Sequence, residues 1–285
     1  MSLNTIESTN IESVLSRFLT SFVGAEKENF SKEIVALDKS HKTKGVKEPK
    51  ELAERKKLKA FKRFSSKRCP DDKKPRLLVT FDGTKFSKVK SSPESKQNKK
   101  IFFILESPHK DEYDSTGNGI RPANGTSSGS AGGNFNKSIL DVLDLFNLNK
   151  KCFSNGTYEI YILNAVSFQT SLGHTTDEYR TVLFRLLWDL GGKVLFESKI
   201  QSKLEDSNCE SFYFINACTI GGPSKKRERI VDFQIKNEKD YCLDPLESTT
   251  PLSEVIQPTL DKFNAEPKVT LLNSYHPSRW KELIK

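Results

Sequence analysis

The segment VTLLNSYHPSRW, residues 269–280, combines the two features that decide the fold of this chain. Its first four residues are apolar or β-branched and indicate a short buried strand, and the polar residues after them indicate a turn. His276 lies in that turn. Open α/β sheets bind ligands at the carboxyl ends of their strands, so His276 is either a catalytic group at a strand end or an ordinary turn histidine.

Three further apolar, β-rich runs precede this strand, at residues 101–105, 158–163 and 212–217. Helical patterns separate the four runs, at 135–146, 177–190 with 193–204, and 225–236 with 252–263. Apolar strands that alternate with helices are typical of a parallel sheet covered on both faces. The sequence therefore predicts an α/β fold with three α/β/α layers around a central four-stranded parallel sheet. A separate strand, RLLVTFDG at 76–83, is expected to turn back in a hairpin at Asp82 and Gly83.

The first 70 residues have a different pattern. Apolar residues recur at helical spacing over 6–22, and shorter helices are expected at 32–39 and 49–64. The segment CPDDKKP, residues 69–75, has the prolines and acidic residues of a boundary. The sequence therefore predicts a helical, basic region at 1–70 and an α/β domain at 71–285.

The net charge of the 285-residue chain is +9, and the excess lies in one segment. Residues 41–70 contain 12 Lys and Arg against 3 Glu, which accounts for the whole excess. Such a segment suits a polyanion, because cations neutralise phosphates and release counterions. The alternative is a helix face that only keeps the chain soluble. We expect DNA as the partner, with contacts from Lys56, Lys57, Lys62 and Arg63.

Several classes of protein are not indicated. The five cysteines form no CxxC pair, which favours reduced thiols over a zinc or iron–sulfur site. No apolar run approaches the roughly 20 residues of a membrane span, and the N-terminus lacks the pattern of a secretory signal. The string GTSSG at 125–129 has the GxSxG spacing but lies in a long loop and not directly after a predicted strand, as a nucleophile elbow would, and no GxxxxGK[ST] loop is present. We therefore expect a cytoplasmic, DNA-associated monomer without metal or cofactor.

Polar residues follow each of the four predicted strands. Glu106 to His109 follow the first strand, Asn164 ends the second, residues 219–223 follow the third, and residues 273–280 follow the fourth. The strands of a parallel sheet end at the same edge, so these groups are expected to line one cleft. A carboxylate can handle water or a cation, an amide can read the edge of a heterocycle, and a histidine can stabilise a leaving anion.

Three of these strand ends resemble the uracil-DNA glycosylase superfamily. LESPHKDE at 105–112 is similar to the GEAPGxxE motif of one branch, HPSRW at 276–280 is similar to its HPSPL motif, and ILNAV at 162–166 resembles the strand that carries its base-reading Asn. The resemblance covers about residues 76–285. It implies that Glu106 positions or activates the attacking water, with Asp111 or Glu112 as substitutes. It also implies that His276 donates a hydrogen bond to the departing base.

The resemblance gives further residues a role. Asn164 would read the pyrimidine edge, and Ser107 and Ser278 would bind phosphates on either side of the flipped nucleotide. Phe135 would stack under the base, or it is the first core residue of the next helix. Trp280 would be the wedge pushed into the duplex, with Arg279 as a phosphate or orphan-base contact. Alternatively, Trp280 anchors the C-terminal turn.

The chain departs from the family pattern at Leu105, where the family has Gly, and at His109, a position that often screens the 5-substituent of the pyrimidine. The long loop at 114–134 suits a roomier pocket than uracil requires. We therefore expect a monofunctional DNA glycosylase that removes uracil or a modified pyrimidine, in base-excision repair or in defence against phage with modified DNA. The alternatives are a non-catalytic nucleic-acid-binding module that senses a base, and another α/β hydrolase.

Overall fold

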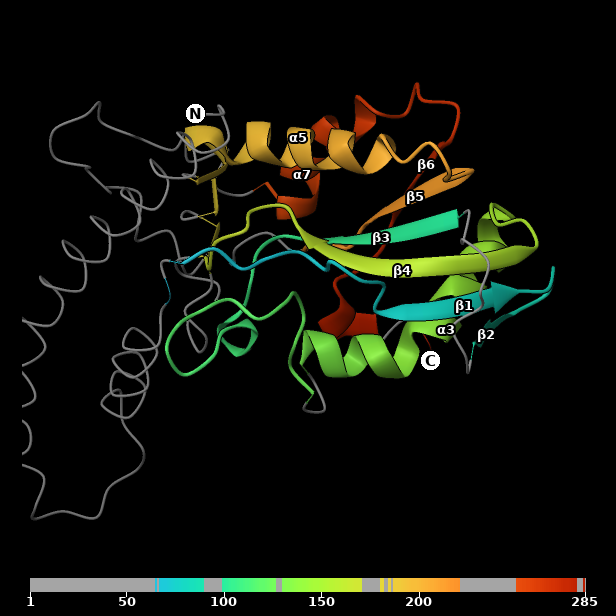
Figure 1. The fold of residues 1–285 in the computed structure, drawn as a ribbon, viewed down its shortest axis with the longest axis horizontal. Helices are drawn as coiled ribbons and strands as arrows, with labels where there is room; N and C mark the ends of the chain where they lie inside the picture. The colour runs from blue at the N-terminus through green and yellow to red at the C-terminus, as the bar shows by residue number, and fades with distance from the viewer. Residues whose placement is uncertain are drawn as a thin grey trace, which may run out of the picture.

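The computed structural model describes residues 65, 67–89, 99–126, 130–170, 180–181, 184–185, 187–220, 250–280 and 284. Within them lies one six-stranded sheet with helices on both of its faces (Figure 1). The strands are β1 (Leu77–Phe81), β2 (Phe86–Lys88), β3 (Lys99–Leu105), β4 (Gly156–Asn164), β5 (Ser211–Asn216) and β6 (Val269–Asn273). The longer helices are α3 (Ala131–Lys150), α5 (Lys193–Leu204) and α7 (Leu252–Asp261).

The sheet is mixed, in the order β2-β1-β4-β3-β5-β6. Strands β4, β3, β5 and β6 are parallel neighbours, and they are the four apolar runs of the sequence. The prediction of a four-stranded parallel sheet is nevertheless wrong, because β1 adds antiparallel to β4 and β2 pairs with β1. The expected strand at 76–83 and its hairpin are confirmed. Gly83 has φ of +99°, a conformation that residues with a side chain rarely adopt.

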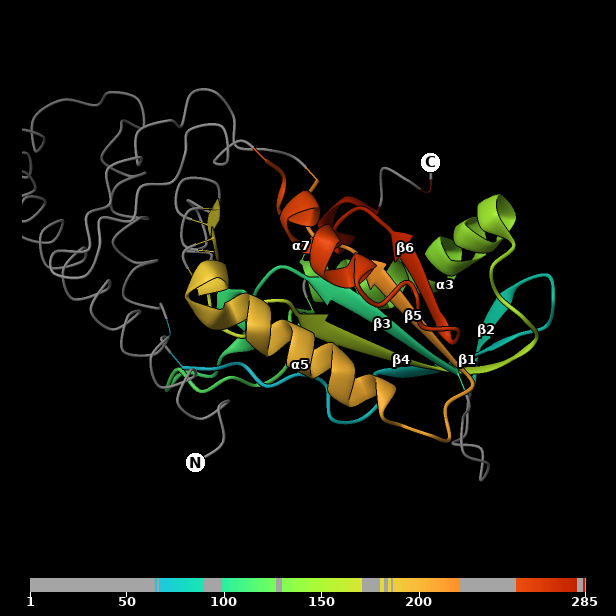
Figure 2. The same ribbon diagram turned by 90° about the horizontal axis from the view of Figure 1, so that it is seen from above.

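Side chains of the central strands are buried on both faces of the sheet. In β3, Ile101, Phe103 and Leu105 pack toward α3, whereas Phe102 and Ile104 pack toward α5 and α7. Figures 1 and 2 show α3 on one side of the sheet and both α5 and α7 on the other. This two-sided burial explains why the strands are continuous apolar runs rather than alternating ones.

The helix predictions are confirmed where the structure describes them. The stretch 193–204 has the same bounds as α5, 252–263 overlaps α7, and 135–146 lies inside α3. Helix α3 begins earlier than predicted, because the Ser130 hydroxyl accepts a hydrogen bond of 3.0 Å from the Gly133 amide as an N-cap. The predicted helices at 6–22, 32–39, 49–64 and 225–236 lie outside the described residues, and 177–190 is described in part.

The α/β domain begins before residue 71. The Ser65 amide donates a hydrogen bond of 3.0 Å to the side chain of Gln169, and the Cys69 amide donates one of 2.8 Å to the Ser167 carbonyl. Cys69 is buried. The CPDDKKP segment thus contacts the α/β domain from its first residue. No helix among the described residues has the length and apolar character needed to cross a membrane.

Candidate active site

The residues that follow the parallel strands remain hydrogen-bonded to one another. The Val166 amide donates to the Glu106 carbonyl at 3.0 Å, and the Ser274 amide donates to the Asn216 carbonyl at 2.8 Å. The sheet spacing therefore continues for one or two residues past the strand ends. As predicted, it brings the segments with Glu106, Asn164 and His276 to one edge of the sheet.

Glu106 is a buried carboxylate with several partners. Thr219, which follows β5, donates its hydroxyl to Oε1 at 2.8 Å and its amide to Oε2 at 3.3 Å. The Arg180 guanidinium lies 3.5 Å from Oε1. Burial tends to raise the pKa of Glu106, but attraction to His276 when that ring is protonated, the charge of Arg180 and the hydrogen bonds from Thr219 outweigh burial and lower the pKa. Glu106 is therefore ionised at neutral pH although only 5% of its surface is exposed.

His276 faces Glu106 with the nitrogen that carries its proton. Nδ1 accepts a hydrogen bond of 3.3 Å from the Ser278 amide and lies 2.8 Å from the Ser278 hydroxyl. In the neutral ring the proton is therefore on Nε2, which lies 4.0 Å from Oε2 of Glu106. Burial lowers the pKa of His276, with Glu106 opposing and Arg180 supporting the shift. The imidazole is neutral at pH 7 and can donate from Nε2.

Asn164 and Glu112 form a second pair beside the first. The side-chain nitrogen Nδ2 of Asn164 donates to Oε2 of Glu112 at 3.3 Å, and both residues are buried. Burial raises the pKa of Glu112 to about 8 against the opposing hydrogen bonds, so its protonated form predominates at neutral pH. Oδ1 of Asn164 is buried and has no donor among the described residues. An unsatisfied buried acceptor is costly, so this oxygen would gain from a hydrogen bond with any donor that reached it.

Along the chain His109 lies between Glu106 of the first pair and Glu112 of the second. It caps the short 3-10 helix Lys110–Glu112, with Nδ1 3.4 Å from Oδ2 of Asp111. Burial lowers the pKa of His109, with Asp111 opposing, and His276 is close enough to contribute to the shift. The side chain of His109 remains 38% exposed and is available to a ligand at this edge.

The residues expected to contact DNA differ in exposure, and four of them lie outside the described part of the chain. The Ser107 hydroxyl lies 2.5 Å from that of Thr170 and is half-buried. Ser278 is exposed, and its hydroxyl and amide orient His276. Arg279 is exposed on the same 3-10 turn, Pro277–Arg279. Lys56, Lys57, Lys62 and Arg63 lie outside the described residues.

Phe135 and Trp280 are core residues, and here the structure corrects the site prediction. Phe135 is 1% exposed and Trp280 is 0% exposed. The Phe135 ring packs edge-on against Phe103 at 5.1 Å between centroids and tilted against Trp280 at 5.4 Å. The Trp280 indole donates to the Tyr275 carbonyl at 2.7 Å and to the Ser274 hydroxyl at 3.1 Å. Neither ring has a face for a base or a duplex, so the alternatives, helix core and turn anchor, hold.

We expect Trp280→Ala to lower the free energy of unfolding by about 3–5 kcal/mol, because it empties a buried site under α3. Denaturant unfolding followed by circular dichroism measures this loss. Tyr275→Ala removes a neighbouring aromatic ring that is 42% exposed, and it should cost less than about 0.5 kcal/mol. If Trp280→Ala were as stable as Tyr275→Ala and lost only DNA binding, the residue would be a wedge after all.

Two residues of this site were not singled out from the sequence. Arg180 lies in a stretch predicted only as a helix, and Thr219 was noted only as part of the segment after the third strand. Neither residue belongs to a sequence motif. Each contributes to the site through its contact with the Glu106 carboxylate. Their signal is spatial: they neutralise and bind a buried charge that would otherwise be unstable.

The arrangement combines an ionised carboxylate, a neutral histidine donor and a buried amide acceptor at one edge of the sheet. No group of His, Cys, Asp or Glu suited to a metal ion occurs in the described part of the chain. No protein-family model matches the chain, and no curated protein or solved structure matches it either.

Proposed function

We propose that the chain is a monofunctional DNA glycosylase that hydrolyses the N-glycosidic bond of a flipped-out pyrimidine nucleotide. The observation that carries this proposal is the pairing of the ionised Glu106 with Nε2 of the neutral His276 at 4.0 Å. The three-layer arrangement and the resemblance of the strand-end motifs to the uracil-DNA glycosylase superfamily support the same reaction.

Each group has a defined task in this reaction. As the bond between C1′ and the base nitrogen breaks, positive charge develops on the sugar, and the Glu106 carboxylate stabilises it and orients the attacking water. His276 donates its Nε2 proton as a hydrogen bond to the base oxygen that becomes negative. Water supplies the new hydroxyl on C1′ and loses its second proton to the solvent, and the base anion takes up a proton from the solvent after it leaves. The base and an abasic site are the products.

The side-chain carbonyl of Asn164 suggests which base would fit the site. Its Oδ1 needs a hydrogen-bond donor, and the N3–H of uracil or of another 2,4-dioxopyrimidine is such a donor. His109 would meet the 5-substituent, and the length of the loop at 114–134 in the sequence allows a larger one, so a modified pyrimidine is an equal candidate. The role would be repair or defence against phage with modified DNA.

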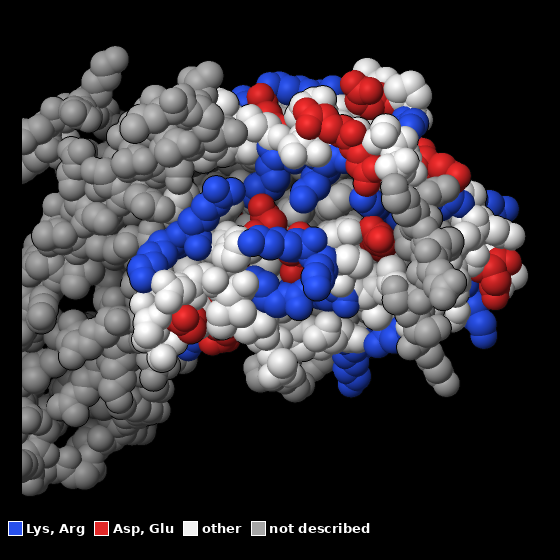
Figure 3. All heavy atoms as spheres, in the orientation of Figure 1, with Lys and Arg blue, Asp and Glu red and all other residues white. Residues whose placement is uncertain are grey.

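The surface is compatible with DNA as the partner. On the face drawn in Figure 3, Lys and Arg atoms surround a small group of Asp and Glu atoms near the centre. The Lys and Arg side chains near the centre of this face would favour the approach of a polyanion, although Asp and Glu atoms also lie at its upper and right-hand edges. Arg279 lies exposed on the turn that holds His276 and would contact the DNA backbone next to the flipped nucleotide.

The direct test is incubation of the protein with single-stranded and duplex oligonucleotides that contain uracil or modified pyrimidines, followed by alkaline cleavage of abasic sites. We expect His276→Ala to lower the rate by about 10²–10³-fold with binding retained, because one donor to the leaving base is lost. Gln201→Ala, on the exposed surface of α5, is the control. Wild-type binding without abasic sites on any substrate would instead indicate a base-sensing module.

A further inference from the structure

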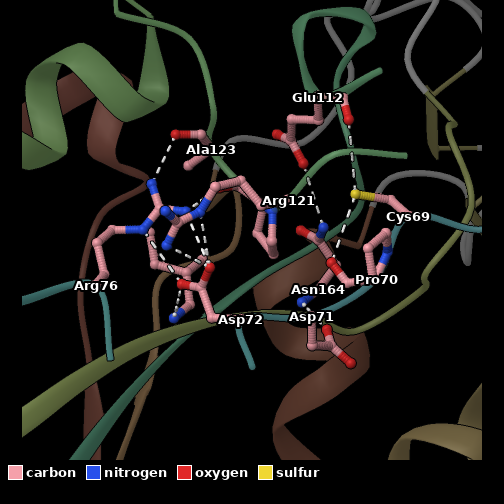
Figure 4. Close-up of polar contacts among 11 residues, drawn as sticks. Cys69, Pro70, Asp71, Asp72, Arg76, Glu112, Arg121, Ala123 and Asn164 are labelled. Carbon is pink, nitrogen blue, oxygen red and sulfur yellow. Dashed lines mark hydrogen bonds and ion pairs between the residues drawn. The ribbon is translucent and has the colours of Figure 1, made fainter. Parts of the chain in front are cut away.

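Two consecutive aspartates lie along the edge of β4 next to the site (Figure 4). β1 covers β4 only as far as Ile160. Beyond that point Oδ2 of Asp72 accepts from the Ile162 amide at 3.1 Å, and Oδ1 of Asp71 accepts from the Asn164 amide at 3.3 Å. The two carboxylates therefore replace the carbonyl groups of a missing neighbouring strand.

Both aspartates are paired with cations that extend the contacts. Asp72 is only 1% exposed at its side chain and accepts from Arg76 at 3.2 Å and from Arg121 at 2.7 Å. Asp71 lies 3.0 Å from Nζ of Lys199. Lys199 also donates to the backbone carbonyl of Asn164 at 2.6 Å. The ion pair between Asp71 and Lys199 therefore binds both the backbone amide and the backbone carbonyl of Asn164.

The same network reaches Glu112 from the other side. Arg76 donates to the Ala123 carbonyl at 2.9 Å and also to the Pro122 carbonyl. Ala123 has φ of +44°, an uncommon conformation for a residue with a side chain, and such a backbone is held only by its surroundings. Its backbone hydrogen bond stabilises the Glu112 carboxylate. Both members of the pair Asn164 and Glu112 are thus tied to the two aspartates.

We propose that Asp71 and Asp72 form a clamp that positions Asn164 and Glu112 for reading the base. The proposal rests on the proposed function and adds two positioning residues that no strand-end motif contains. The side chains that read a base must be held to within a fraction of an ångström, and displacement by a remote change can cost a large part of the rate. The clamp supplies this rigidity on the β1 side of β4, where no strand lies beside Asn164, whereas β3 pairs with the other side at Leu105.

The test is a double-mutant cycle on the preferred oligonucleotide, with Asp71→Asn and Asn164→Ala as the single variants. Asparagine keeps the size of Asp71 but loses the charge that pairs with Lys199. We expect the rate of abasic-site formation to fall about 10- to 100-fold. In the Asn164→Ala background the same substitution should have little further effect, because the group that it positions is gone. Fully additive losses would overturn the proposal.

Two measurements separate positioning from general damage. Binding to DNA with a tetrahydrofuran abasic analogue, which lacks a base, should be unchanged in Asp71→Asn, and a parallel loss of this binding would count against the clamp. The matched control is Asp206→Asn, which removes the carboxylate paired with Lys100 at the amino end of β3. This variant should keep the wild-type rate.

The clamp and the proposed function can fail separately. If the wild-type chain forms no abasic sites on any substrate, the proposed function fails. The clamp is then tested by the side-chain amide resonance of Asn164 in a heteronuclear NMR spectrum of the free protein. A shift of that resonance in Asp71→Asn and not in Asp206→Asn supports the clamp, and an unchanged resonance in both overturns it.

Discussion

Glu106→Gln is expected to lower the rate of abasic-site formation by about 10²–10⁴-fold, the range for loss of a positioned acid–base group. Glutamine keeps the size of the side chain and an oxygen that can accept from Thr219. In the proposed mechanism it removes the negative charge that would stabilise the sugar cation and orient water. Single-turnover measurements with excess enzyme isolate this step from product release.

Binding supplies the control for this variant. Removal of the charge should leave the affinity for uncleaved DNA equal to or above that of the wild type, because a carboxylate near the backbone repels phosphates. Asp111→Asn is the matched substitution, since Asp111 is a nearby acid with a side chain that is 46% exposed. If Asp111→Asn lost the activity and Glu106→Gln kept it, Asp111 would be the water-activating group.

The strands and the parallel core could be predicted from the sequence because their signal is local. IFFIL, YEIYIL, FYFINA and VTLL consist mainly of apolar and aromatic residues, as is typical of strands in a sheet covered on both faces. The hairpin at Asp82 and Gly83 was also predictable from its turn residues. Its place in the sheet was not, because the pairing of β1 with β4 depends on contacts between residues about 80 positions apart. Apolar periodicity says nothing about which neighbour a strand takes.

The site shows the same division between local and spatial signals. Glu106, Asn164 and His276 were identifiable because each is a chemically capable residue directly after a strand. The roles expected for Phe135 and Trp280 came from their place in a motif, which fixes the order along the chain but not which side of the sheet a ring enters. Their burial in the α3 layer explains why these two expectations fail.

The CPDDKKP segment shows why a boundary signal can mislead. Prolines and aspartates are typical of turns, and they predicted a domain boundary at 69–75. In the structure Asp71 and Asp72 use their carboxylates as acceptors for the amides of β4. The same residue types that end a strand can therefore complete the edge of another one when their side chains replace the missing carbonyl groups.

Glu112→Gln is expected to change how stability depends on pH. The pKa of Glu112 is raised from 4.5 to about 8 in the folded chain, mainly by burial. Between these values the folded chain holds a proton that the unfolded chain has lost. This contribution to the free energy of unfolding is complete below pH 4.5 and falls by about 1.4 kcal/mol per pH unit as the pH rises toward 8. From pH 5 to pH 8 the loss is about 4 kcal/mol.

Glutamine does not titrate, so Glu112→Gln should lack this slope. The free energy of unfolding of wild type and variant is measured by denaturant unfolding at pH 5 and pH 8. Subtracting the variant from the wild type at each pH cancels the contributions of titrating groups that both proteins share. Glu266→Gln removes an exposed carboxyl before β6 and should parallel the wild type. Parallel curves for Glu112→Gln would mean that Glu112 is ionised in the folded chain. The pair with Asn164 would then present a negative charge to the base, and a neutral pyrimidine would no longer be the ligand that fits it best.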